Sequence, residues 1–442
     1  MSEPVELDIE TDVEDEVPTA IPLTEPADGT PPVVVTEASL SITIDSLASG
    51  TGPIAVDAER AGGYRYTQGA FLLQFRRAGS GTHLIDPVPL SDLSALNDAL
   101  VGTEWVLHAA PQDLPCLAEL NLLPSQLFDT EVAARLLGKP RVGLAALVES
   151  ELGLALAKEH SAVDWSKRPL PEPWLRYAAL DVEVLVELRD ILEQELREVD
   201  RWEWAQEEFE YLRTAPEKPT RPDRWRKTSG IHRLRAPAQL ALVRELWVER
   251  DRIARTRDIA PGRTLADSAI AAAATANPES QESLAKLPAF SGRGARRNLD
   301  AWWSAIKRAR SLTVDQLPGR ATPSSGPPPH RSWPDRDPGA AARLTQARNA
   351  LAAISATTGI AAETLLTPAT VRALCWTPPE DLSASSVAEA LTELGARRWQ
   401  IAICARAFSE AFIELRDKPP ASSDGDEQNA ELEETSTPTV TS

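Results

Sequence analysis

The spacing of apolar and polar residues predicts an α/β region over residues 39–212. Short apolar runs bounded by Gly, Pro and polar residues predict strands at 52–59, 70–76, 82–87 and 104–109. Apolar residues three and four positions apart predict helices at 93–100, 111–120 and 130–138 and over the long stretch 172–212. Strands that come first, followed by helices that alternate with a strand, favour a mixed sheet flanked by helices.

Two further regions have a helical pattern throughout. Residues 230–312 and 341–416 are therefore predicted to be all-α domains of similar length. A basic linker at 213–229 precedes the first of them, and a segment rich in Pro and Gly at 313–340 separates the two.

The net charge of −20 is concentrated at the two ends of the chain. Residues 1–38 contain eleven acidic residues and residues 419–442 contain six, and neither segment contains Lys or Arg. Because such acidic segments cannot bury a core, we predict disordered acidic tails at 1–38 and 417–442. The region between the tails is nearly neutral, so the net charge does not argue against a nucleic-acid substrate.

Cysteine and histidine usage excludes several classes of metal site. Cys116, Cys375 and Cys404 are far apart in the sequence, and the five His residues occur singly. Neither a zinc finger nor an HExxH site fits this pattern. Sparse Cys suits a reducing compartment, and no apolar run is long enough to cross a bilayer. We therefore expect a cytoplasmic protein that does not bind membranes.

Acidic residues mark a candidate site within the α/β region. Asp57 and Glu59 lie two positions apart on a predicted strand, which places both carboxylates on one face and Val56 and Ala58 on the other. Asp113 follows the end of another predicted strand, in the first turn of a helix, where α/β proteins usually form their sites. Each acid also has a simpler interpretation, as a solvated strand end or an ordinary acid at a helix N-terminus.

A fourth acid interrupts the apolar stripe of a predicted helix. Asp181 occupies a position where the pattern predicts an apolar residue, and Tyr177 lies one turn earlier on the same face. A buried carboxylate needs a cation or hydrogen-bond donors. Two interpretations stay open for Asp181: an ion pair with Arg176 or Arg189, or a metal ligand.

Four acids without a Cys or His ligand form a set of oxygen donors. Such a set suits Mg²⁺ or Mn²⁺ better than zinc. Two of these ions about 3.5–4 Å apart can bind the attacking and leaving oxygens of a phosphoryl displacement. The residues alone thus favour a two-metal phosphoryl-transfer site.

The sequence around these acids resembles the DEDD superfamily of 3′–5′ exonucleases, ribonuclease D type. Three motifs, VDAER…FLLQF, VLHAAPQDL and YAALDVEVL, contain, in order, Asp57, Glu59 and Gln74; His108 and Asp113; and Tyr177 and Asp181. The four-residue spacing of the last pair is that of the branch with tyrosine beside the final acid. The segments FDTEVAARLLG (128–138) and DWSKRPLPEPWLRYAALD (164–181) are similar to ribonuclease D as well.

The resemblance implies an RNase H-like exonuclease domain that releases nucleoside 5′-monophosphates from RNA 3′ ends, such as those of tRNA precursors. It implies that the four acids hold two divalent ions, Mg²⁺ or Mn²⁺, and that Tyr177 orients the attacking water. Gln74, His108 and Arg168 belong to the same motifs or to the segment between them, and we predict that they contact nucleic acid.

Residues 230–312 also resemble an HRDC domain, a helical nucleic-acid-binding module, and residues 341–416 resemble a second one more loosely. The segment SGRGARRN (291–298) of the first carries Arg293, Arg296 and Arg297. We predict that these arginines bind phosphate, with the neighbouring glycines allowing close approach of the backbone. A helix cap with solvated arginines is the alternative.

Two other functions stay open. A DNA-directed 3′–5′ exonuclease would carry the same motifs, and RNA is favoured by the resemblance to ribonuclease D alone. A catalytically inactive nucleic-acid-binding scaffold is the second alternative, and the presence of all four acids and the tyrosine argues against it. The sequence identifies no protein partner.

Overall fold

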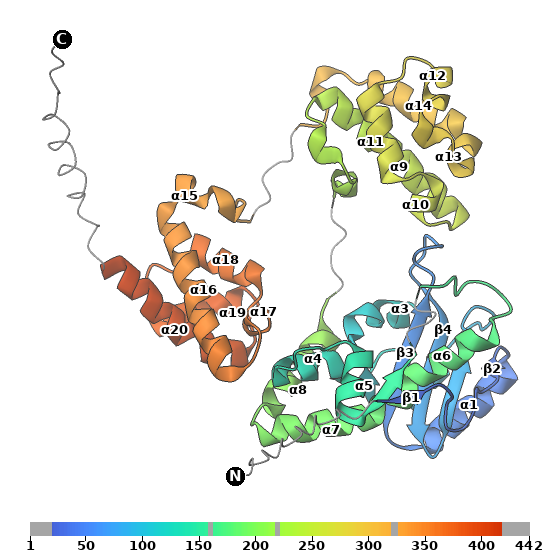
Figure 1. Ribbon diagram of the computed structural model, residues 1–442, viewed down its shortest axis with the longest axis vertical. Helices are drawn as coiled ribbons and strands as arrows, with labels where there is room; N and C mark the ends of the chain where they lie inside the picture. The colour runs from blue at the N-terminus through green and yellow to red at the C-terminus, as the bar shows by residue number, and fades with distance from the viewer. Residues whose placement is uncertain (1–19, 158–161, 217–221, 320–325, 418–442) are drawn as a thin grey trace, which may run out of the picture. The chain divides into compact units, whose positions relative to one another are not determined.

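The computed structural model describes residues 20–157, 162–216, 222–319 and 326–417. The chain divides into two compact units, Met1–Pro323 and Ser324–Ser442, each of which is described by itself (Figure 1). The predicted acidic tail lies outside the described residues over 418–442, as does the first part of the other tail, over 1–19.

A six-stranded mixed sheet forms the centre of the first unit (Figure 1). Its strands, in spatial order, are β2 (Val33–Val34), β5 (Gly81–Ile85), β4 (Ala70–Ala78), β3 (Thr51–Arg60), β6 (Glu104–Leu107) and β7 (Gln126–Asp129). β4 pairs antiparallel with β3 and β5, and the other neighbours are parallel. The predicted strands and the mixed sheet are confirmed. The additional strands β2 and β7 are too short for their periodicity to stand out.

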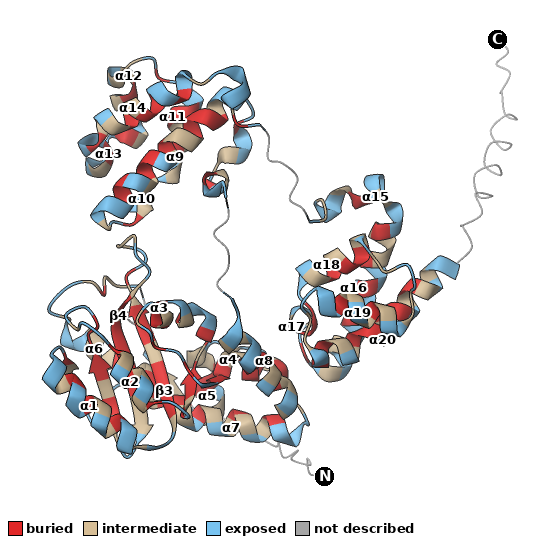
Figure 2. Ribbon diagram, turned by 180° about the vertical axis from the view of Figure 1, so that it is seen from behind, coloured by how far each residue is buried: buried red, intermediate tan, exposed pale blue. Residues whose placement is uncertain are grey.

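Helices cover both faces of this sheet. They are α1 (Glu37–Ser49), α2 (Ser94–Ala99), α3 (Leu114–Ala118), α4 (Thr130–Leu137), α5 (Leu144–Leu152), α6 (Glu172–Glu183), α7 (Leu185–Glu198) and α8 (Trp202–Thr214). Figure 1 shows α6 in front of the sheet, and Figure 2, seen from behind, shows α1 and α2 on the opposite face. α6 packs on the sheet because its small residues Ala178 and Ala179 share a buried cluster with Leu72 and Leu84.

The N-terminal segment is folded from residue 20 onward. β1 (Ile21–Leu23) pairs in parallel with β8 (Leu154–Leu156), and Val33 of β2 pairs with Leu84 of β5. Two ion pairs, Glu25 with Arg176 and Asp28 with Arg76, also hold the segment. The prediction of a disordered tail over 1–38 is therefore wrong for residues 20–38. Pairing with residues far away in the sequence stabilises a segment whose composition suggests disorder.

An all-α region follows in the first unit. Its helices are α9 (Pro237–Arg257), α10 (Pro261–Thr264), α11 (Asp267–Ala276), α12 (Gln281–Ala285), α13 (Arg293–Arg297) and α14 (Leu299–Arg310). Trp225, in a short 3₁₀ helix at Arg224–Lys227, is buried in the core of this region. The prediction that 213–229 is entirely linker is thus wrong at its C-terminal end, because burial of this large aromatic ring ties the segment to the helices.

The second unit is also all-α. Its helices are α15 (Trp333–Arg336), α16 (Pro338–Thr358), α17 (Ala362–Leu365), α18 (Pro368–Trp376), α19 (Ala384–Glu393) and α20 (Arg398–Asp417). α15 and the start of α16 fall within the predicted linker 313–340, where Trp333 is fully buried and packs on Trp376. The unit therefore begins earlier than its helical periodicity suggests. Within the part of the chain that the structure describes, no helix combines the length and apolar character needed to cross a bilayer.

Candidate active site

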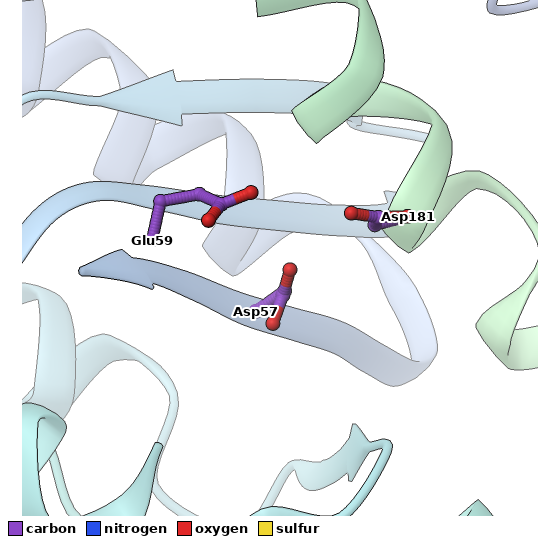
Figure 3. Close-up of side chains that lie close together, drawn as sticks. All are labelled: Asp57, Glu59 and Asp181. Carbon is purple, nitrogen blue, oxygen red and sulfur yellow. The ribbon is translucent and has the colours of Figure 1, made fainter. Parts of the chain in front are cut away.

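Three carboxylates converge between β3 and α6. One oxygen from each of Asp57, Glu59 and Asp181 lies within 4.8 Å of the others, and Figure 3 shows the side chains pointing toward one another. β3 presents Asp57 and Glu59 on one face, while Val56 and Ala58 are buried on the other. The structure thus brings together the strand pair and the helical acid that the sequence singled out.

Asp113 reaches the same place from the turn between β6 and α3. Its carboxyl is buried, with Oδ1 3.5 Å from Nη2 of Arg60. A cavity of about 390 Å³ is lined by Asp113 and the three other acids, together with His108 and Tyr177. Four acids that are 124 residues apart at the extremes therefore face one cavity.

Asp129, which the sequence analysis missed, holds the turn that carries Asp113. Its carboxylate is fully buried and accepts hydrogen bonds from the backbone N–H of Ala109 at 3.1 Å and of Ala110 at 2.8 Å. Ala109 has a positive φ of 58°, an unfavourable value for a residue with a Cβ, and these bonds stabilise it. Asp129 also caps the N-terminus of α4, which is the signal that the sequence offered: an Asp directly before a predicted helix.

Burial and mutual repulsion keep the pKa values of the four acids high. Burial is the first cause for each of them: it raises the pKa of Asp57 and of Asp181, and with the charges of the neighbouring acids it raises that of Glu59 well above its usual range. Burial and the charge of Asp57 raise the pKa of Asp113 to about 8. The guanidinium of Arg60 opposes the shifts of Asp57, Glu59 and Asp113, and a hydrogen bond from Tyr177 opposes that of Asp181, without cancelling them. Buried oxygen donors with excess negative charge fit divalent cations such as Mg²⁺ and Mn²⁺.

The ion-pair interpretation of Asp181 is wrong. Arg176 pairs with Glu172 at 2.7 Å, and Arg189 pairs with Glu104 at 2.8 Å. Both arginines are engaged by other acids, so neither offers the compensating charge that a buried Asp181 would need.

Tyr177 hydrogen-bonds to the carboxylate of Asp181, one helical turn away. Burial, followed by the charges of Asp181 and Glu59, raises the pKa of Tyr177 above its usual range. The hydroxyl therefore stays protonated near neutral pH and acts as a hydrogen-bond donor and acceptor rather than as a base.

Two residues predicted to contact nucleic acid have other positions. Gln74 is 0% exposed and does not line the cavity, so the prediction of a direct contact is wrong for this residue. Arg168 donates to both oxygens of Asp86, at 2.5 and 2.7 Å, and to the carbonyl oxygens of Trp165 at 2.7 Å and Phe71 at 2.8 Å. Its donors are used to hold the chain around residues 165–168, which corrects the prediction to a structural role.

His108 does line the cavity. Its Nδ1 lies 2.8 Å from Oγ1 of Thr130, at the start of α4. Burial lowers the pKa of His108 to about 4, so the imidazole is neutral at pH 7. A contact between His108 and nucleic acid stays a prediction, and it would be that of a neutral hydrogen-bonding group.

The three arginines of α13 line a separate cavity. Arg293, Arg296 and Arg297 surround a hollow of about 560 Å³ together with Ser291. The glycine between them has a packing role, because a Cβ on Gly294 would lie 2.8 Å from the carbonyl oxygen of Arg263. Gly292, in contrast, has no atom within 4 Å of where a Cβ would lie. Close approach of a phosphate to this segment and phosphate binding by the arginines both stay predictions.

Three family models match the chain. Residues 32–197 match a "3'-5' exonuclease", residues 239–306 an "HRDC domain", and residues 326–412 a "3' to 5' exonuclease C-terminal domain". The third match falls on the region predicted as a second HRDC-like domain. Its helices confirm the predicted all-α fold, and the likeness to HRDC stays a prediction.

Curated and solved relatives agree with these matches. A "Ribonuclease D" of Sphingobium indicum is 30% identical over 298 residues, which cover 64% of this chain and 71% of the relative. The ribonuclease D proteins of Zymomonas mobilis and Nitrobacter hamburgensis are matched over 62% and 53% of their length, so the chain spans roughly half to seven-tenths of these relatives.

Two crystal structures are similar over most of the chain. A protein from Bifidobacterium adolescentis is 38% identical with a TM-score of 0.82, covering 89% of this chain and 100% of that one. Escherichia coli RNase D, described as "an exoribonuclease involved in structured RNA processing", is 27% identical with a TM-score of 0.62, covering 82% of this chain and 98% of that one. With its acids, its fold and these matches in agreement, the chain belongs to the ribonuclease D family.

Proposed function

We propose that this protein is a 3′–5′ exoribonuclease that hydrolyses the 3′-terminal phosphodiester of RNA and releases nucleoside 5′-monophosphates. The observation that carries the proposal is the convergence of Asp57, Glu59 and Asp181, with Asp113 and Tyr177 facing the same cavity. The description of E. coli RNase D supports RNA as the substrate and structured RNA 3′ ends, such as those of tRNA precursors, as its class. The protein would act in the cytoplasm, where such RNAs are found.

Asp57, Glu59, Asp113 and Asp181 would hold two Mg²⁺ or Mn²⁺ ions. The fit rests on the donors themselves, since all are carboxylate oxygens and their raised pKa values show that Arg60 alone does not balance their charge. When bound, such a pair of ions stabilises the negative charge that develops on the attacking and leaving oxygens.

Tyr177 would orient the attacking water. Its hydroxyl remains protonated and is positioned by Asp181, so it offers a fixed hydrogen-bonding partner at the edge of the acid cluster. His108, neutral and anchored to Thr130, also lines the cavity and would form a hydrogen bond with the terminal nucleotide.

The arginines of α13 would bind RNA phosphates outside the catalytic cavity. Arg293, Arg296 and Arg297 are clustered, and phosphate contacts by Arg supply affinity without sequence preference. Replacing all three with Ala should weaken binding of a long RNA and make the dependence of log Kd on log salt less steep. Hydrolysis of short oligomers should be unchanged. Unchanged salt dependence would remove these arginines from the RNA-binding surface.

A labelled-substrate assay tests the proposal as a whole. RNA and DNA of the same sequence, labelled at the 3′ end, are incubated with Mg²⁺, Mn²⁺ or EDTA, using wild type, Asp57→Ala and the control Asp98→Asn, which changes an exposed acid on α2. We expect monophosphate release from RNA by wild type and the control, and none with EDTA or Asp57→Ala. Preferential release from DNA would instead identify a DNA-directed enzyme. Binding of RNA without release under any condition would identify an inactive scaffold.

A further inference from the structure

Gln74 is a buried amide without a hydrogen-bond partner. The side chain lies in the middle of β4 and is 0% exposed. Among the described residues, neither its Nε2 nor its Oε1 has a partner. Burying an amide without hydrogen bonds destabilises a fold, so such a residue calls for an explanation.

Another buried glutamine of this chain has hydrogen-bond partners for its amide. Gln400 is also buried, at 2% exposed, and both of its amide atoms are bonded. Its Oε1 accepts from the N–H of Arg397 at 3.0 Å, and its Nε2 donates to the carbonyl of Thr364 at 3.1 Å. Gln74 therefore differs from Gln400, the other buried glutamine among the described residues, in a way that burial alone does not explain.

The register of the sheet places Gln74 beside the acid cluster. Gln74 is the direct cross-strand partner of Asp57, and side chains of such pairs lie on the same face with Cβ atoms about 5 Å apart. Its neighbours two positions away both face α6: Leu72 packs with Ala178, and Arg76 pairs with Glu183 at 2.9 Å. By the alternation of a strand, Gln74 points to the same helix, which carries Asp181.

A carboxylate that holds a metal ion through one oxygen still has lone pairs on the other. A donor fixed behind it orients the carboxylate, and partners of this kind affect metal affinity nearly as much as the ligands do. The amide nitrogen of Gln74 is such a donor, held in place by β4 and closed off from water.

We propose that Gln74 is a positioning residue for the metal site, whose amide nitrogen donates a hydrogen bond to the Asp57 carboxylate when that carboxylate holds a divalent cation. The inference rests on the proposed metal-dependent function. It means that the amide destabilises the metal-free protein and serves the site only when the cations are bound.

The substitution Gln74→Met tests this inference, because it keeps the length of the side chain and removes both polar atoms. In EDTA, the thermal unfolding midpoint should be equal to or higher than that of wild type. Mn²⁺ affinity, measured by electron paramagnetic resonance of the free ion, should fall about 10–100-fold. At saturating Mn²⁺, kcat on a short RNA should fall while KM stays within about twofold.

Gln400→Met is the matched control. It removes a buried amide whose bonds are already formed, so it should lower the unfolding midpoint in EDTA and leave Mn²⁺ affinity and kcat unchanged. Gln74→Met should thus lower Mn²⁺ affinity without lowering the unfolding midpoint, whereas Gln400→Met should lower the midpoint without changing Mn²⁺ affinity.

Two results would overturn the inference. A lower midpoint for metal-free Gln74→Met would show that the amide is already bonded without metal, and unchanged Mn²⁺ affinity would show that it does not serve the site. If wild type itself neither binds Mn²⁺ nor releases nucleotides, the proposed function fails and the inference fails with it. That outcome is seen in wild type, before any variant is compared.

Discussion

The carboxyl of Asp113 should make the metal-free protein less stable as the pH rises. Burial and the charge of Asp57 raise its pKa to about 8, far above the value near 4 expected in the unfolded chain. An acid whose pKa is higher in the folded state holds its proton more tightly there. Its stabilising contribution is therefore fully present below about pH 4 and is lost as the pH rises through about 8.

The size of the effect follows from the shift. Between pH 5 and about pH 7 the folded state holds about one proton more than the unfolded state at this carboxyl, which corresponds to about 1.4 kcal/mol per pH unit; at pH 8 the difference is about half a proton. Over the three units the free energy of unfolding should fall by about 4 kcal/mol. For a domain of this size that is on the order of 10 °C in the unfolding midpoint.

The substitution Asp113→Asn removes this loss because an amide does not ionise. Thermal unfolding of wild type and Asp113→Asn in EDTA at pH 5, 6, 7 and 8 should show a difference in midpoint that grows with pH in favour of the variant. Asp98→Asn, at an exposed position, should follow wild type at every pH. In the same variant, release of nucleotides with Mg²⁺ should be lost.

A difference between Asp113→Asn and wild type that is constant from pH 5 to pH 8, or that shrinks, would refute the reasoning. It would mean that the Asp113 carboxyl is ionised at low cost in the metal-free fold. The negative charge of Asp113 would then already be balanced by the protein, and the uncompensated charge on which the metal assignment depends would be absent at this residue.

Three other substitutions test single contacts. Tyr177→Phe should lower kcat at saturating Mn²⁺ at least about 10-fold, because the hydroxyl that orients water is lost; an unchanged kcat at saturating Mn²⁺ would contradict that role. Asp129→Ala removes the acceptor of four backbone N–H groups and should lower the free energy of unfolding in urea by about 4 kcal/mol; a loss below about 1 kcal/mol would show that the turn does not depend on it. Arg168→Lys keeps the charge but loses the paired hydrogen bonds to Asp86, so stability should fall by about 2 kcal/mol with RNA affinity unchanged. Weaker RNA binding at unchanged stability would restore the nucleic-acid contact that the sequence suggested.

Local periodicity was enough to predict which site residues share one element. The two-residue repeat of a strand places Asp57 and Glu59 on one face, and the helical repeat places Tyr177 one turn from Asp181. Both relations depend only on backbone geometry within a few residues, so they hold whatever the rest of the fold does. The motif order then indicated the family, and the comparisons confirm it.

Roles that depend on distant partners were not determined in this way. Arg176 and Arg189 were both available to Asp181 by sequence distance, and the fold gives each of them another acid. Arg168 was expected at the substrate because of its motif, and its partner Asp86 lies 82 residues away. Charged side chains pair with whichever group tertiary packing brings within reach. A local sequence pattern therefore does not indicate a partner that lies far away in the chain.

The sequence by itself thus determined the acids, their order and the elements that present them. Tertiary structure decided that residues 20–38 fold, since β1 pairs with β8 more than a hundred residues later. It also decided that Gln74, which its motif suggested as a nucleic-acid contact, is fully buried opposite Asp57 on the neighbouring strand. The burial of a side chain and the pairing of a strand depend on residues from distant parts of the chain. They are therefore decided only when the strands and helices pack together.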